Sequence, residues 1–190
     1  AADDACRAKL LNVHLDLQFQ NADDAISPTR WQADTFPEHA RGRISILHEG
    51  IDTEIACSDR SSQLTLRSGE TLSAEDDIIT FVARNLEPYR GYHTFMRSIP
   101  KVLSKNTKAR VIIVGDDKEG GYGPKPSQLE HGDLSWKQIF LREVESSLTA
   151  DMRSRIHFVG RVPHAYLIKI LQISGAHVYL TYPFVLSWSF

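Results

Sequence analysis

Two arginines follow an apolar segment in the middle of the sequence and could bind a diphosphate. The stretch Thr80–Tyr92 has the pattern of a buried strand whose connection to the next helix carries Arg84 and Arg90, with Gly91 where that helix begins. Guanidinium groups pair with phosphate oxygens, a helix N-terminus offers free N–H groups, and glycine lets the main chain approach a ligand. The alternative is an ordinary strand–helix connection with solvated arginines, and the stretch alone favours neither.

The composition is that of a globular protein and argues against several functions. Of 190 residues, 42% are hydrophobic and 24% are charged, and the formal net charge of −2 offers no field to attract nucleic acid. Cys6 and Cys57 lie far apart without metal-ligand spacing, which favours a reducing compartment. The sequence contains no signal peptide and no apolar run of membrane-spanning length. Because it begins at Ala1 and its last residues are apolar, we expect a piece of a longer protein.

Residues 1–50 have the pattern of a small first segment. An apolar stripe predicts a helix over residues 1–20, Ala25–Ser27 is a candidate strand, and Arg43–His48 is predicted to be a buried strand. Between them, Thr29 has the character of an N-cap for a short helix that Pro37 would end. Residues 51–77 are polar and irregular, which predicts a linker that contains a small hairpin over residues 64–72.

Residues 78–190 alternate between strand and helix patterns. Apolar strands are predicted at Ile78–Val82, Arg110–Val114, Arg155–Val159 and Ala176–Leu180. Helices are predicted around 92–103, around 139–148 with Ser135 or Asp133 as the N-cap, and after Pro163. This alternation predicts an α/β fold with a Rossmann-like parallel sheet. In the common nucleotide-binding strand order, the ligand lies between the first and fourth strands, so the loops 83–91 and 181–190 would face one site.

The chain resembles the C-terminal half of the retaining glycosyltransferases of group 1, which have the GT-B fold of two Rossmann-like domains. The resemblance covers nearly all of residues 20–190. It rests on five short segments that occur in the family's order: Ile46–Asp52, Phe81–Arg84 with Tyr89–Gly91, Val111–Gly115, Ile156–Val162 and Ser174–Leu180. It implies that residues 1–50 are the end of an N-terminal, acceptor-side domain. Residues 78–190 would then be an incomplete donor-binding domain.

The resemblance also implies roles for the matched residues. Arg84 and Arg90 would bind the donor diphosphate and stabilise its charge, with Arg90 standing where the family often has Lys. Gly91 would place the helix N-terminus near the phosphates, and Gly115 would let the second strand's loop approach the nucleotide. Val162, with the main chain around Arg161, would border the nucleobase. No metal and no cofactor other than the nucleotide-sugar substrate is implied.

One departure from the family concerns an acidic motif after the fourth strand. The family carries two glutamates eight positions apart, and the first would fall near Phe184. The segment from Tyr182 to Phe190 has no acidic residue. The first glutamate is therefore replaced, which puts catalysis by this chain alone in doubt.

Three further features have two interpretations each. Asp116 and Asp117 could hold a metal ion, but solvated turn residues are favoured. The loop around Tyr122–Pro126 could be a lid over the site or a mobile connection. The three tryptophans could stack on a sugar, but a role in packing is favoured; Trp188 is the best candidate for a contact in the site.

The function that we expect is transfer of a sugar, with retention, from a nucleotide-diphosphate-sugar donor to an acceptor that is a glycan, a lipid or a small molecule. An NAD-dependent enzyme is disfavoured because no G-x-G-x-x-G follows a strand. The alternative function is a non-catalytic nucleotide-, sugar- or partner-binding module, which the missing acid favours. We expect a cytoplasmic location that allows peripheral membrane contact of the whole protein. An uncovered fourth strand favours self-association of this chain.

Overall fold

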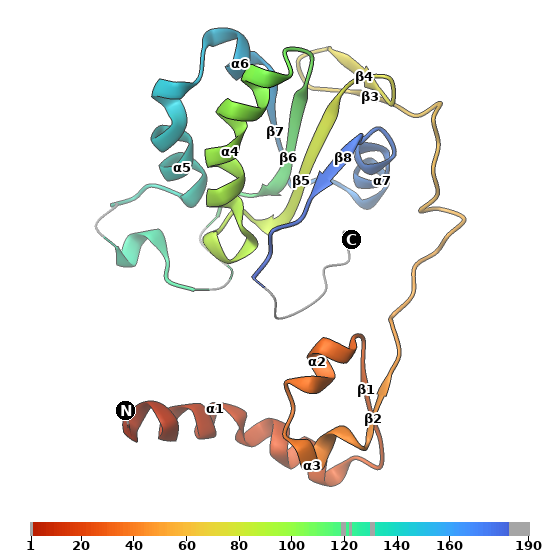
Figure 1. Cartoon of the computed structure of the whole chain (residues 1–190), viewed down its shortest axis with the longest axis vertical. Helices are drawn as coiled ribbons and strands as arrows, with labels where there is room; N and C mark the ends of the chain where they lie inside the picture. The colour runs from red at the N-terminus through yellow and green to blue at the C-terminus, as the bar shows by residue number, and fades with distance from the viewer. Residues whose placement is uncertain (1, 119–120, 122, 130–131, 183–190) are drawn as a thin grey trace. The chain divides into compact units, whose positions relative to one another are not determined.

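The computed structural model describes residues 2–118, 121, 123–129 and 132–182. The described residues divide into two compact units, residues 2–51 and 52–182. Figure 1 identifies the helices and strands of each unit. In the described part of the chain, no helix is both long enough and apolar enough to cross a membrane.

The first unit pairs two short strands with three helices. Its elements are α1 (Ala2–Asn21), β1 (Ala25–Ser27), α2 (Arg30–Asp34), α3 (Glu38–Arg41) and β2 (Ile44–Ile46). The strands are parallel, with Ala25 opposite Ile44. The Thr29 side chain accepts a hydrogen bond from the Gln32 N–H and caps α2, as predicted. The Arg43 guanidinium donates to the carbonyl oxygens of Phe19, Ala22 and Asp23, which ties the end of α1 to β2.

Two predictions for this unit are wrong. The segment 43–48 is not a buried strand: β2 has three residues, and Ile46 is 42% exposed. An apolar run is covered only where elements pack on both faces, and β2 pairs with a single short strand, β1. Pro37 does not end α2, which stops at Asp34. It occupies the N-cap of α3, where its lack of an N–H costs nothing.

The second unit is built on a four-stranded parallel sheet. A hairpin of β3 (Gln63–Thr65) and β4 (Thr71–Ser73) leads into β5 (Ile78–Asn85), which is followed by β6 (Arg110–Asp116), β7 (Ile156–Gly160) and β8 (Ala176–Val178). The strand order is β7-β6-β5-β8: the second and third strands are added on one side of β5 and the fourth on its other side, so the strand order reverses between the first and fourth strands. The predicted Rossmann-like α/β sheet is confirmed, and so is the predicted place of the reversal.

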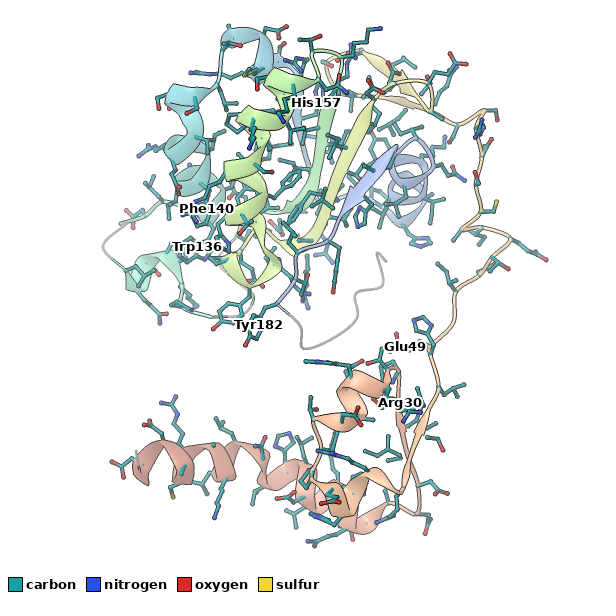
Figure 2. The ribbon with its side chains drawn as sticks, in the orientation of Figure 1. Arg30, Glu49, Trp136, Phe140, His157 and Tyr182 are labelled. Carbon is teal, nitrogen blue, oxygen red and sulfur yellow. The ribbon has the colours of Figure 1, made fainter. Side chains whose placement is uncertain are left out.

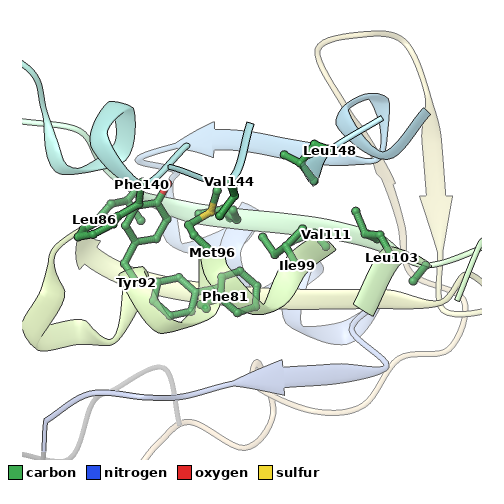
Figure 3. Packing of buried hydrophobic residues seen from close by; sticks show 13 residues of the cluster. Phe81, Leu86, Tyr92, Met96, Ile99, Leu103, Val111, Phe140, Val144 and Leu148 are labelled. Carbon is green, nitrogen blue, oxygen red and sulfur yellow. The ribbon is translucent and has the colours of Figure 1, made fainter. Parts of the chain in front are cut away.

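Helices cover both faces of this sheet (Figure 1). The connections contain η1 (Pro88–Arg90), α4 (Tyr92–Lys105), η2 (Pro126–Gln128), α5 (Trp136–Val144), η3 (Glu145–Ser147), α6 (Ala150–Ser154) and α7 (His164–Gln172). On one face, α4, α5 and α6 pack against Phe81, Val111 and Ile113 (Figure 3). On the other face, α7 and the hairpin pack against Ile78, Ile112 and Val114. Both faces of the central strands β5 and β6 are therefore covered, which explains their continuous apolar sequences.

The hairpin packs directly on this sheet. Leu64 and Leu72 from its strands are each 1% exposed and belong to the same apolar cluster as Ile112. The Tyr166 hydroxyl from α7 donates to the Thr65 carbonyl oxygen at 3.1 Å. Residues 63–73 are thus part of the layer that covers one face of the sheet.

Arg155 joins three elements at the end of the sheet where the parallel strands begin, opposite their carboxyl ends. Its side chain donates to the carbonyl oxygens of Leu103, Asn106 and Ala109 at 3.0 to 3.3 Å and pairs with Asp151 at 2.9 Å. The residue is only 8% exposed. It satisfies carbonyl groups at the C-terminus of α4 and just beyond, where helix carbonyls have no intrahelical partner.

We predict that Arg155→Ala lowers the free energy of unfolding by about 3 kcal/mol, because it leaves the buried carbonyl groups of Leu103 and Ala109 without their charged donor. Arg153→Ala is the matched control. Arg153 is half-exposed, so water can replace its pair with Glu145 at 3.1 Å and its bonds to the carbonyl oxygens of Glu145 and Leu148. Its loss should therefore cost about 1 kcal/mol, clearly less than the loss of Arg155. Urea unfolding followed by circular dichroism measures both, and equal costs would contradict the prediction.

Candidate anion-binding site at the carboxyl edge of the sheet

The end of β5 is irregular, and this irregularity carries Arg84. Val82 pairs with Val114 and Asn85 pairs with Asp116, so β5 has one more residue than β6 between these pairs. Such a bulge re-aims the side chains next to it. Arg84 therefore belongs to the strand, whereas its sequence pattern predicted a place in the loop that follows. The prediction was wrong here because the apolar pattern ends at Ala83 while main-chain pairing continues to Asn85.

Gly115 lies opposite the bulge. A Cβ atom at this position would stand 2.7 Å from Leu86 Cδ2 and 2.8 Å from the Ala83 carbonyl oxygen. The missing side chain thus lets the bulged end of β5 approach β6. Its predicted role beside a nucleotide stays a prediction.

Gly91 lies between η1 and α4 with a left-handed backbone, φ 75°. A Cβ atom at Gly91 would collide with the Cβ and the carbonyl oxygen of Leu180, which follows β8. Nearby, the Tyr182 N–H donates to the Tyr89 carbonyl oxygen at 2.7 Å, and the two rings meet edge to face. The chain after β8 therefore lies against the β5–α4 connection, although residues 183–190 are outside the described residues. Figure 2 marks Tyr182.

The ends of three strands surround a polar pocket of about 410 Å³. It brings together the two predicted arginines and adds two further cations and two carboxylates. The described lining residues are Arg84, Asn85, Glu87, Arg90, Asp116, Lys118, Gly121 and Arg161. The excess of positive charge and the small apolar share of the lining suit an anion with several oxygens.

Arg90 and Glu87 form an ion pair in the wall of this pocket. Arg90 Nε lies 3.7 Å from Glu87 Oε1, and the side chains are 14% and 3% exposed, respectively. Arg84, Lys118 and Arg161 are exposed. The pocket thus combines the largely buried guanidinium of Arg90, which pairs with Glu87, with three cations whose side chains reach into water.

The other predicted site residues lie beside this pocket. Gly91 and Gly115 support the segments that carry Arg90 and Asp116 but are not among the described lining residues. Val162 packs on the apolar cluster beneath α7 and lines a neighbouring pocket of about 520 Å³. Arg161 lines both pockets. The predicted contact between Val162 and a nucleobase stays a prediction.

The side chains of Lys118 and Arg161 were not predicted to belong to an anion site. Both follow the carboxyl ends of strands: Arg161 comes directly after β7, and Lys118 comes two residues after β6. Parallel strands end at one edge of a sheet, so a search for cations just after each apolar segment could have found them.

The described carboxylates near the pocket do not gather into a metal-binding group. Asp117 Oδ2 lies 3.6 Å from Lys137 Nζ. Within the described ranges, no three His, Cys, Asp or Glu side chains are arranged to hold a metal ion. The positions of the family's first glutamate, near Phe184, and of Trp188 lie outside the described residues.

Two histidines lie within strands, His157 in β7 and His177 in β8, and both are partly buried against neighbouring side chains. His177 Nδ1 lies 3.0 Å from the Thr80 hydroxyl, and burial lowers the pKa of His177. His157 Nε2 lies 3.8 Å from Glu70, and the pKa of His157 is also lowered, chiefly by burial. Trp136 stacks on Phe140 with 5.5 Å between the ring centroids (Figure 2).

Comparison with known proteins agrees with this architecture. Residues 1–56 match a family model described as the glycosyl transferase family 4 group. The chain is similar in structure to sucrose-phosphate synthase from Thermosynechococcus elongatus, with a TM-score of 0.56 and 17% sequence identity. The α/β fold of this chain matches part of the fold of a GT-B glycosyltransferase. The match covers 86% of this chain and 36% of that one, so the chain spans about a third of the length of its structural neighbour. No curated protein sequence matches it.

We predict that Gly91→Ala destabilises this unit by about 2 kcal/mol or more, because the side chain adds a collision with Leu180 to the strain of a left-handed backbone. Gly69→Ala is the control, because it brings the backbone strain without the collision. Gly69 has φ 89° with no atom near its missing Cβ, so it should cost only about 1 kcal/mol. Urea unfolding monitors both variants, and a Gly91→Ala cost no larger than that of Gly69→Ala would argue against a tight contact.

Proposed function

We propose that this chain contributes the donor-diphosphate site of a glycosyltransferase. The whole protein would transfer a sugar, with retention, from a nucleotide-diphosphate-sugar to an acceptor. The observation that carries the proposal is the meeting of Arg84, Arg90 and Arg161 in one pocket at the carboxyl edge of the sheet. In open α/β sheets, ligands bind outside the carboxyl ends of the strands. The family match of residues 1–56 and the GT-B fold support the same function.

The chemistry follows from the charges. When the bond between the sugar and the diphosphate breaks, negative charge grows on the leaving diphosphate. Arginines placed beforehand in a pocket stabilise this charge without a costly rearrangement of solvent. Arg84 and Arg90 would supply this stabilisation, and Arg161 and Lys118 line the same pocket. Val162 would border the base from the neighbouring pocket.

A non-catalytic nucleotide- or sugar-binding module is the second candidate. It is favoured by the absence of an acidic residue from Tyr182 to Phe190, where the glycosyltransferases that the chain resembles carry a glutamate. Such a module would bind the nucleotide as proposed without turning over its sugar conjugate. Incubating the protein with nucleotide-sugars and following release of the free nucleoside diphosphate would separate the two functions.

We predict that the chain binds one of UDP, GDP or ADP in a saturable manner, and that Arg84→Ala/Arg90→Ala weakens this binding at least about a hundredfold. Each lost guanidinium removes a charge-assisted contact worth about 1.5–3 kcal/mol. Isothermal titration calorimetry with the three nucleotides and their sugar conjugates measures the affinities. The nucleotide that binds also identifies the base.

The control is Arg97→Ala. Arg97 is an exposed arginine on α4 that pairs with Glu143 at 2.6 Å and does not line the pocket. Its loss should leave nucleotide affinity unchanged. If no nucleotide binds to folded protein, or if the double variant and Arg97→Ala lose affinity equally, the assignment of this pocket is wrong.

A further inference from the structure

A buried carboxylate forms part of the wall of the cationic pocket. The Glu87 side chain is 3% exposed and lines the pocket together with the three arginines. A negative charge in this position repels phosphate, so by itself it weakens anion binding. If the pocket binds an anion, Glu87 must therefore favour that binding in another way that outweighs the repulsion.

Glu87 is held by both its main chain and its side chain. Its N–H donates to the Asn85 carbonyl oxygen at 3.1 Å, and its own carbonyl oxygen accepts from Arg90 N–H at 3.1 Å. The Gly121 main chain lies so close to the carboxylate that a Cβ atom at Gly121 would overlap it. The carboxylate therefore has a defined place between η1 and the segment after β6.

The short helix η1 aligns this carboxylate with Arg90. Residues three apart lie above one another in a 3-10 helix, and Glu87 and Arg90 have this spacing across Pro88–Arg90. The resulting contact joins Glu87 Oε1 to Arg90 Nε at 3.7 Å. Holding a long side chain in one place before a ligand arrives reduces the entropy lost on binding.

We propose that Glu87 is a positioning residue that holds the Arg90 guanidinium ready for the pyrophosphate group of the ligand. This inference rests on the proposed function for the identity of the ligand, but it concerns the anion alone. Glu87 improves pyrophosphate binding through Arg90 by more than its own charge opposes it. The two effects have opposite signs, which makes the role measurable.

The test is a double-mutant cycle with inorganic pyrophosphate as the probe, measured by calorimetry on the full chain. Glu87→Gln keeps the size of the side chain and removes its charge. We expect it to weaken pyrophosphate binding about tenfold when Arg90 is present. In an Arg90→Ala background, Glu87→Gln should leave the affinity unchanged or raise it, because only the repulsion is then removed. Glu143→Gln, which removes the partner of Arg97 on the surface, is the matched control and should have no effect.

Each outcome supports or overturns the inference. Tighter binding by Glu87→Gln, or an equal loss of affinity with and without Arg90, would overturn it, and so would a folded wild type that binds no pyrophosphate. If Glu87→Gln does not fold, Glu87→Asp in the same cycle replaces it, since the shorter side chain withdraws the carboxylate from Arg90. A chain that binds pyrophosphate in the expected pattern but no nucleoside diphosphate would refute the proposed function and support the role of Glu87.

Discussion

Close main-chain approach at the carboxyl edge of the sheet is the constraint on which the site depends. Gly91 contacts the main chain of Leu180, and Gly115 lets the bulged end of β5 lie against β6. Without these two contacts, the ends of β5, β6 and β8 would stand further apart and their connections would be placed differently. The contacts place Arg84 and Arg90 over the strand ends that also carry Asp116 and Arg161. Glycine is required because any side chain would occupy the space that the neighbouring segment fills.

The sheet below this edge supplies the rigidity that the site needs. Apolar side chains fill both faces of the central strands, and the hairpin and α7 cover the face that α4 and α5 do not (Figure 1). At the opposite edge, Arg155 joins α4, α6 and the start of β7 through carbonyl groups and Asp151. The cations at the carboxyl edge are attached to the ends of this packed layer. This arrangement is common in binding sites, where loops carry the chemistry and a buried scaffold positions them.

The charges of the pocket have two effects: the cations attract an anion, and the carboxylates limit the positions of the cations. Four cations attract an anion, and Glu87 and Asp116 reduce the net positive charge of the same surface. A guanidinium surrounded only by other cations would be pushed away from them into water. The pairing of Arg90 with Glu87 lowers this repulsion and limits the positions that the arginine can take. Affinity at such a site depends on where the charges are held as much as on their number.

The sequence by itself determined the order and type of most elements, because these depend on interactions over a few residues. Apolar runs predicted the four parallel strands. Thr29 was recognised as an N-cap, and Ser135 was one of two candidates with Asp133, because such side chains bond to the main chain three residues on. The same signal at Thr149 was overlooked, and with it α6. Tertiary structure alone decided the bulge that carries Arg84, the exposure of β2, and the meeting of Arg161 with arginines more than 70 residues earlier in the chain. These features depend on pairing and packing between distant segments, and such contacts leave no periodic pattern in the local sequence.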